Sequence, residues 1–262
     1  MRKYICYDYA ENDITEVKME DFCLLDSPRS PQELSSLKKK TPARIGIGHT
    51  GARYLTQSYL RFRADAAAAA DAVFSEVDPE LVKELGLFEV QTLCENKDMM
   101  LKRPDLGRLF SEDTKRIISE QCRHDIDVQI YVGDGLCSPS IGANIPDILP
   151  AVTLALEADG FTVGTPFFVR YCRVNTARTV SELLGAKLTC VLIGERPGLL
   201  TSESMSAYMA YNARQDMSES DYTVVSNISR RGIPPVEAAA HIAELMEIIL
   251  DKKISGVKLN MR

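Results

Sequence analysis

The sequence lacks the residues on which several common catalytic and metal sites depend. It has no tryptophan and only three histidines, His49, His124 and His241, which lie far apart and form neither HxxxH nor HExxH. Its seven cysteines form no CxxC pair, so the usual spacing of zinc sites and redox motifs is missing. We therefore expect no metal site and no Ser-His-Asp triad in this chain.

Long apolar runs and an excess of positive charge are also missing. No stretch reaches the roughly 18 to 20 consecutive apolar residues that span a bilayer, and residues 1–22 lack the apolar core of a secretion signal. The formal net charge of −6 gives no general attraction to phosphate backbones or anionic membranes. We expect no nucleic acid and no membrane as partners, and the odd number of scattered cysteines favours a cytoplasmic location.

The hydrophobic pattern divides the 262 residues, 45% of which are hydrophobic, into three segments. Residues 1–41 are mixed and polar and form an N-terminal extension with one short helix at "PQELSSLKK". Residues 42–124 form a mainly helical region, in which a long helix begins at Thr56 and only "LFEVQTL" favours a strand. Shorter helices are expected over "PELVKEL" and "SEDTKRIISEQC".

Residues 125–262 alternate between strands and helices. The expected strands are "DVQIYVGDGL", "GTPFFVRYCRV", "KLTCVLIG" and "YTVVSNI", and the expected helices are "PDILPAVTLALEADG", "TARTVSELLGA" and "PPVEAAAHIAELMEIILDKK". Such alternation calls for parallel strands joined by right-handed crossovers. The predicted fold class is therefore α/β, with a doubly wound, mainly parallel sheet in the C-terminal half, preceded by the mainly helical region.

Gly46, Gly48 and Gly51 fit the pattern GxGxxG within "IGIGHTG". A dinucleotide fingerprint also needs a strand before the glycines, a βαβ unit after them and an acidic residue about 20 positions on. Here the charged, proline-broken "LKKKTPAR" precedes them, and Asp65 lies within the long helix that follows. We interpret the glycines as a turn that starts this helix, and a nucleotide-dependent oxidoreductase remains a minor alternative.

In a doubly wound sheet, ligands bind beyond the carboxyl ends of the strands. Four segments follow predicted strands: "GDGLCSPS" (133–140), "RYCRVNTA" (170–177), "GERPGL" (194–199) and "VVSNIS" (224–229). In "GERPG", Glu195 and Arg196 leave a buried strand together. Two interpretations stay open for them: a carboxylate that binds a ligand, or an ion-paired turn at the rim of the sheet.

Three other features favour structural interpretations. "GDGLCSPS" indicates a turn that enters a helix, with Ser138 or Ser140 as N-cap and Cys137 as a much weaker candidate nucleophile. "RPDLGR" (103–108) indicates a structural ion-pair cluster, with a partner contact as the rival interpretation. The alanine run 66–70 indicates a helix packed closely against another element, because small side chains let helix axes approach.

Taken in order, the motifs of residues 43–260 closely resemble those of the small (light) chain of ethanolamine ammonia-lyase. The segments that carry the resemblance are "LRFRADAAAAADAVFSEV", "KRPDLGR", "DVQIYVGDGL", "VGTPFFVRYCRV", "ELLGAKLTCVLIGERPGL", "VVSNI" and "GIPPVEAAAHIAELM". So many motifs in the order of the family are far more specific than any one of them alone.

The resemblance implies the small subunit of an adenosylcobalamin-dependent enzyme that converts ethanolamine to acetaldehyde and ammonia by a radical mechanism. The large chain would hold the substrate, while a Rossmann-like domain at 125–262 would help to bind and enclose the coenzyme B12, so this chain would need no catalytic side chain. The cobalamin contacts of the family fall on Val174 in "CRVN", Glu195 in "GERPG" and Val224 in "TVVSN", where relatives carry Cys.

The resemblance also implies a hetero-oligomer with the large chain, built from six copies of each, inside a bacterial microcompartment whose shell would be a further partner. Residues 1–41 match the family poorly, so encapsulation follows from the family and not from this segment. No histidine lies in a DxHxxG motif, so the dimethylbenzimidazole base of the cofactor is expected to stay on cobalt. A subunit that shields a partner without touching the cofactor is the remaining alternative.

Overall fold

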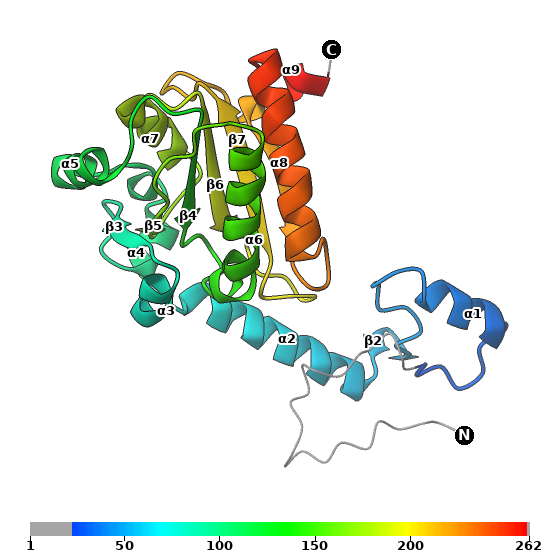
Figure 1. Cartoon of the computed structure of the whole chain (residues 1–262). Coiled ribbons are helices and arrows are strands. Elements are labelled where there is room, and N and C mark those ends of the chain that lie inside the picture. Colours follow the sequence, from blue (N-terminus) through cyan, green and yellow to red (C-terminus); the bar gives the residue numbers. More distant parts are fainter. Residues whose placement is uncertain (1–22, 261–262) are drawn as a thin grey trace. The chain divides into compact units, whose positions relative to one another are not determined.

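The computed structural model describes residues 23–260, and the contacts within it divide the chain into two compact units (Figure 1). The first unit extends to Ala69 and includes Gly198–Leu200, and the second contains Ala70–Pro197 and the chain from Thr201 onward. The division falls inside the long helix α2 (Thr56–Phe74). Residues 1–22 of the predicted extension lie outside the described residues.

The N-terminal unit contains a short helix, a small hairpin and the beginning of α2. Helix α1 (Pro31–Lys38) begins with proline in its first turn, where the missing N–H would have no partner in any case. Strands β1 (His49–Thr50) and β2 (Arg53–Tyr54) pair antiparallel just before α2. Both helices that the sequence predicts in this unit are confirmed.

The glycines of the GxGxxG pattern lie in this hairpin and just before it. Gly46, Gly48 and Gly51 have φ angles of 72°, 71° and 60°, in the left-handed region that favours glycine. Gly51 lies in the turn between β1 and β2, where Thr50 pairs with Arg53. The pattern therefore shapes an antiparallel hairpin that precedes α2, and not the strand-to-helix turn of a dinucleotide site. The sequence interpretation was right to reject a dinucleotide fingerprint, but the turn at Gly51 joins two strands and does not itself start the helix.

Buried charges attach the segment before the hairpin to one face of α2. The guanidinium of Arg44 lies 2.6 Å from a carboxylate oxygen of Asp65, and Arg61 lies 2.9 Å from the other oxygen of that carboxylate. The hydroxyl of Ser58 donates to the carbonyl of Ile47 at 2.6 Å. Breaking a buried ion pair leaves an uncompensated charge, so these bonds hold the segment before the hairpin firmly against this face of α2.

The second unit is built on a six-stranded sheet in the order β3-β5-β4-β6-β7-β8. Strands β3, β5, β4 and β6 pair in parallel, whereas β7 is antiparallel to both β6 and β8. The strands are β3 (Phe88–Gln91), β4 (Val128–Gly133), β5 (Phe167–Arg170), β6 (Leu188–Gly194), β7 (Met205–Tyr211) and β8 (Thr223–Ile228).

The prediction of a mainly parallel sheet is wrong, although the α/β class is confirmed. The sheet is mixed because of β7, a strand that the alternation of strands and helices does not reveal. Only residues 195–204 connect β6 to β7, and they contain no helix. A parallel crossover needs a dozen or more residues, so this short connection turns the chain back antiparallel.

The region before residue 125 contributes an edge strand and several short helices to this unit. Strand β3, in the one segment of 42–124 where the sequence favours a strand, pairs with β5 through Phe88 and Phe167. Two helices that the sequence predicts in this region, α3 (Pro79–Glu84) and α5 (Glu112–Gln121), are confirmed. The short elements of the unit are α3 (Pro79–Glu84), α4 (Lys97–Lys102), η3 (Leu106–Arg108), α5 (Glu112–Gln121), η4 (Glu219–Asp221) and α9 (Val257–Asn260).

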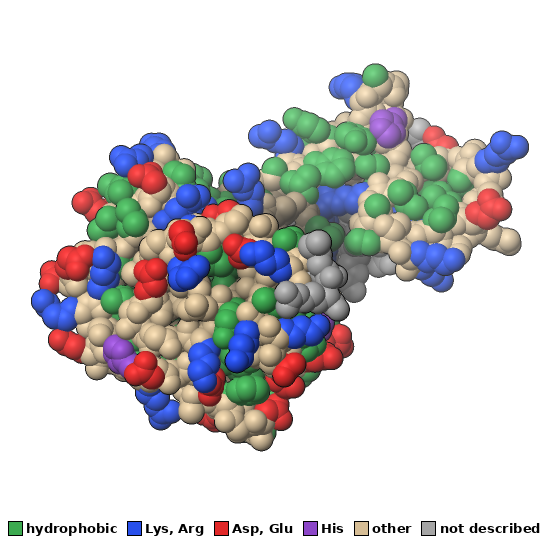
Figure 2. Space-filling view, turned by 90° about the horizontal axis from the view of Figure 1, so that it is seen from above, with side chains coloured by type: hydrophobic (Ala, Val, Ile, Leu, Met, Phe, Trp, Pro, Cys, Tyr) green, Lys and Arg blue, Asp and Glu red, His purple; other side chains and the backbone are tan. Residues whose placement is uncertain are grey.

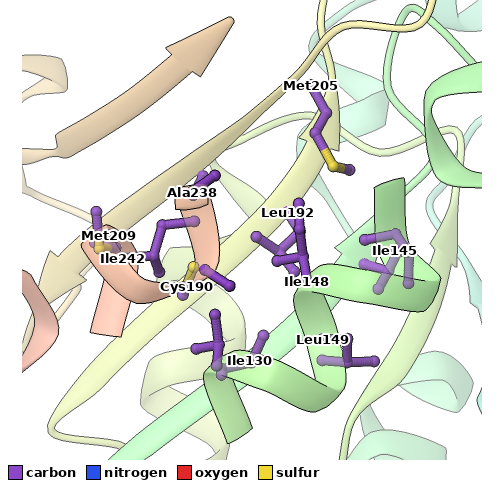
Figure 3. Packing of buried hydrophobic residues seen from close by; sticks show 14 of the residues in the cluster. Ile130, Ile145, Ile148, Leu149, Cys190, Leu192, Met205, Met209, Ala238 and Ile242 are labelled. Atoms are coloured by element: carbon purple, nitrogen blue, oxygen red, sulfur yellow. The ribbon is translucent and has the colours of Figure 1, made fainter. Parts of the chain in front are cut away.

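Helices cover both faces of the sheet. Helices α6 (Pro139–Ala158) and α8 (Pro235–Lys252) lie side by side on one face, and α5 and α7 (Thr176–Leu184) lie on the other (Figure 1). Cys190 and Leu192 of β6 pack with α6 and α8 (Figure 3), whereas Val191 and Ile193 point into the opposite core with α7. None of the helices described between residues 23 and 260 is long and apolar enough to cross a membrane.

Leu192 provides a test of this two-sided core. Its side chain is 1% exposed, so Leu192→Ala should leave a cavity and lower the free energy of unfolding by about 2–5 kcal/mol. Urea denaturation measures this loss, with Leu154→Ala as the control. The side chain of Leu154 is 70% exposed, so its removal should change the free energy of unfolding by about 0.5 kcal/mol at most. Equal losses for both variants would contradict the placement of β6 in the core.

Candidate functional site

A hollow of about 530 Å³ lies at the carboxyl ends of the parallel strands β4, β5 and β6. Residues of the neighbouring strands β7 and β8 form its other side. Val174, Glu195 and Val224, the three residues that the resemblance singles out, all line it. They come from the β5–α7 loop, the β6–β7 connection and β8, so the fold brings together positions that are up to 50 residues apart in the sequence. Val174 packs partly against the core, and Val224 is 42% exposed.

Glu195 is held by hydrogen bonds from the antiparallel part of the sheet. The hydroxyl of Ser204 donates to Oε2 at 2.6 Å, and the hydroxyl of Ser206 donates to Oε1. The backbone N–H of Asn227 also donates to Oε1, at 2.9 Å. The carboxylate is therefore fixed by two hydroxyls and one amide, and not by an ion pair with Arg196 as the simple turn interpretation would require.

A bulge in β8 makes the contact with Asn227. Between Met205 and Ala207 of β7, the paired residue of β8 jumps from Ile228 to Val225. The one extra residue on β8 twists the strand, and Asn227 takes the left-handed φ of 60°. The bulge thus turns a backbone N–H toward Glu195 that regular pairing would place elsewhere.

Two arginines line the hollow, and a third lies near them. Arg173 and Arg196 belong to its lining, while Arg108 is exposed close to Arg173. Burial lowers the pKa of the Arg173 guanidinium; Cys94 opposes this shift, and the positive charges of Arg108 and Arg196 add to it. Arginine remains protonated at neutral pH even so. In the part of the chain that the structure describes, none of the three forms an ion pair with Asp or Glu.

Arg173 is only partly satisfied by its own chain. One terminal nitrogen, Nη2, donates to the carbonyl of Met100 at 2.9 Å, but Nε is buried without a partner. The backbone N–H of Arg173 donates to the carbonyl of Gly107, which attaches it to the turn "RPDLGR". In that turn Arg103 pairs with Asp105 at 2.7 Å, as the structural interpretation predicts. All three arginines lie in motifs that stand out in the sequence, but only the fold brings them together.

A buried ion pair fixes the turn after β4, which forms another wall of the hollow. The ammonium of Lys97 lies 2.8 Å from Oδ1 of Asp134, and it also donates to the carbonyl of Gly135 and to the hydroxyl of Ser138. Lys97 and Asp134 are nearly or wholly buried. The predicted N-cap position of Ser138 is confirmed, but its hydroxyl does not cap the helix. The hydroxyl oxygen lies 2.7 Å from Oδ1 of Asp134 and 2.8 Å from the carbonyl of Ser75, and its one hydrogen is shared between these acceptors.

This turn touches the strand that leads to Glu195. The N–H of Leu136 donates to the carbonyl of Gly194 at 3.1 Å. A Cβ at position 135 would lie 2.3 Å from the same carbonyl, so only glycine fits there. Cys137, next in the turn, is fully buried, and burial raises the pKa of its thiol to about 11. A thiol that stays protonated at neutral pH is a poor nucleophile, so nothing in this environment activates Cys137 for that role.

The buried ion pair leads to a prediction for Lys97. Lys97→Met should lower the free energy of unfolding by about 3–5 kcal/mol, because it leaves the buried carboxylate of Asp134 without its cation. Lys102→Met on the same helix removes an exposed pair with Asp98 and should cost about 1 kcal/mol at most. Chemical denaturation measures both, and adding Asp134→Asn to Lys97→Met should recover part of the loss. Equal costs for the two lysines would argue against the buried pair.

Comparison with known proteins places these features in a family. The family model described as "Ethanolamine ammonia-lyase light chain (EutC)" matches residues 31–260. The small subunit of ethanolamine ammonia-lyase from Clostridium tetani is 50% identical over 249 residues, which cover 95% of this chain and 84% of that protein. The same subunit of Clostridium perfringens is 50% identical over 94% of this chain and 84% of its own length, and that of Listeria monocytogenes serovar 1/2a is 46% identical over the same shares. The chain therefore belongs to the ethanolamine ammonia-lyase light-chain family, the small subunits of a carbon–nitrogen lyase.

Proposed function

We propose that this chain helps to bind and enclose adenosylcobalamin in a complex with the large subunit. The observation that carries the proposal is that Val174, Glu195 and Val224 line one hollow at the ends of the strands. Doubly wound sheets bind their ligands in this position. The large subunit would hold ethanolamine, and the complex would convert it to acetaldehyde and ammonia. Bound adenosylcobalamin would supply the radical chemistry, so this chain would contribute binding and enclosure.

The side chains at the hollow fit the chemistry of cobalamin. An ionised carboxylate has about four acceptor positions, and three of those of Glu195 are occupied within the chain. Its Oε2 can still accept a hydrogen bond from an amide of the corrin periphery. Val174 and Val224 offer apolar surface and backbone groups beside it. The hollow is an open depression at the surface, which suits a half-site that a second chain completes.

The arginines fit the anionic part of the cofactor. Cobalamin carries one phosphodiester in its nucleotide loop, and arginine recognises phosphate oxygens through charge-assisted hydrogen bonds. Arg173 has a buried Nε without a partner, and Arg196 lies in the same lining. We assign the phosphodiester to these two side chains, with Arg108 adding positive charge from nearby.

The remaining parts of the proposal concern assembly and location. The relatives of this chain are named small subunits, which implies a large partner subunit. We propose a hetero-oligomer with six copies of each chain. We also propose that the complex lies in a bacterial microcompartment in the cytoplasm, with the shell as a further partner. Most of residues 1–41, the segment that would address the protein there, lies outside the described residues.

Glu195→Ala tests the role of the carboxylate. It removes the acceptor at Oε2 and the anchor for Ser204 and Ser206, so the complex with the large subunit should bind adenosylcobalamin about tenfold more weakly or worse. Glu203→Ala, which removes an exposed carboxylate from the same connection, serves as the matched control. Binding is measured by titration of the purified complex. Unchanged affinity in an intact complex would favour a subunit that shields without contacting the cofactor.

Arg173→Met tests the assignment of the phosphodiester. The variant complex should lose affinity for cobalamin but much less affinity for cobinamide, which lacks the nucleotide loop and its phosphate. A loss of about 1.5–3 kcal/mol, or about ten- to hundredfold, is expected for a hydrogen bond to a charged group. Equal losses for the two ligands would show that Arg173 acts on the shape of the hollow and not on the phosphate.

A further inference from the structure

One face of the antiparallel part of the sheet is open at the hollow. Tyr208 of β7 and Val224 of β8 lie on this face and line the hollow, and both are partly or largely exposed. The alternate residues of the two strands point the other way, into the core beneath α6 and α8; they are Met205, Ala207, Met209, Val225 and Ile228. The open face therefore has its own side chains available to a ligand.

Tyr208 and Val224 form one apolar surface. They are directly paired across β7 and β8, so their side chains are neighbours on the same face. The ring of Tyr208 meets that of Tyr222 edge to face, with the centroids 6.2 Å apart and an angle of 80° between the ring planes. Because Tyr222 is buried and such contacts are favourable, Tyr208 is supported from inside the protein. We call the ring of Tyr208 and the side chain of Val224 the aromatic floor of the hollow.

The aromatic floor carries no charge. Burial raises the pKa of the Tyr208 phenol, and the negative charges of Glu195 and Glu219 raise it further, against a smaller effect of Ser206. The phenol therefore stays protonated at neutral pH. A ligand would meet a neutral ring and an aliphatic side chain here, in contrast to the arginines of the same hollow.

Positive charge at the hollow is a local feature. The whole chain has a formal net charge of −6, and Figure 2 shows Asp and Glu mixed with Lys and Arg over the face of the second unit in view. Arg173 and Arg196, in contrast, line the hollow and form no ion pair with Asp or Glu among residues 23–260. An anionic group of a ligand would therefore lie beside these two side chains, which leaves the aromatic floor to an uncharged group.

The dimethylbenzimidazole base of cobalamin has the chemistry that this floor can bind. One of its ring nitrogens is bonded to ribose and the other is expected on cobalt, so the bound base keeps no nitrogen for a hydrogen bond to protein. It offers a flat bicyclic face and two methyl groups, and aromatic side chains contact such faces favourably. One ribose separates the base from the phosphodiester. A phosphodiester at Arg173 and Arg196 would therefore keep the base within reach of the floor.

We propose that the aromatic floor contacts the dimethylbenzimidazole base of bound adenosylcobalamin, with the ring of Tyr208 against the face of the base. The inference rests on the proposed function, since it needs cobalamin in the hollow. It divides the hollow into three parts: Glu195 for an amide of the corrin, the two arginines for the phosphodiester, and the floor for the base. Each part can be tested with its own variant.

The test is titration of the purified complex with the large subunit, using two ligands. Adenosylcobalamin has the base, whereas adenosylcobinamide methyl phosphate keeps the corrin and a phosphodiester but has no base. Tyr208→Leu removes the ring and should weaken the binding of adenosylcobalamin about five- to hundredfold, the range for loss of stacking on a base. It should weaken the binding of the base-free ligand much less, and Tyr208→Phe, which keeps the ring, should restore most of the affinity. Tyr211→Leu, on the same strand but outside the lining of the hollow, is the matched control.

Other results would overturn the proposal. Equal losses for the two ligands would show that Tyr208 shapes the hollow or meets the corrin instead of the base. Unchanged affinity of Tyr208→Leu for adenosylcobalamin would show that the ring does not meet the cofactor. If Glu195→Ala and Arg173→Met also left this affinity unchanged, the proposed function itself would fail.

A second variant covers the case in which Tyr208→Leu does not fold, as judged by circular dichroism. Val224→Ser removes apolar surface at a position that is 42% exposed, where the fold tolerates substitution better. It should weaken the binding of adenosylcobalamin more than that of adenosylcobinamide methyl phosphate. The same loss for both ligands would count against the aromatic floor as the site of the base.

Discussion

The carboxylate of Glu195 ties together the two halves of the sheet. It follows the last parallel strand, β6, and accepts hydrogen bonds from Ser204 and Ser206 of the returning chain and from Asn227 in the bulge of β8. Without these bonds, the antiparallel half would be joined to β6 at this end only by its backbone ladder. The hollow exists because strands of both directions are fixed around one charged group, and the β8 bulge is part of that arrangement.

Two groups of charge near the hollow are treated in opposite ways by the fold. Lys97 and Asp134 are buried and bonded to each other, so they stabilise the turn after β4 and leave no net charge for a ligand. Arg108, Arg173 and Arg196 gather without a carboxylate partner among the described residues, although their mutual repulsion costs free energy. A folded protein keeps such a cluster at a cost, and an anion would relieve it. This contrast supports the proposal that the arginines bind an anion, whereas the buried pair is structural.

Much of the fold follows from local sequence patterns. Thr56 begins α2 and the run from 188 to 194 forms β6, because helical spacing and a continuous apolar stretch are strong local signals. The pattern of alternating strands and helices does not predict β7, because this buried antiparallel strand lies between two loops and has no crossover helix next to it in the sequence. The grouping of Arg173 with Arg108 and Arg196, and the pairing of Lys97 with Asp134, are missed for a related reason: each joins residues that are distant in the chain.

The sequence by itself determined the α/β class, the positions of most helices and strands, and membership in the light-chain family, because these depend on periodicity and on motifs read in order along the chain. Only the tertiary structure decided the mixed direction of the sheet, the bonds that hold Glu195, and the faces of α2 that are buried or exposed. Strand direction, hydrogen-bond partners and exposure depend on contacts between distant segments. A local pattern specifies which elements form, but the packing of those elements specifies what each side chain meets.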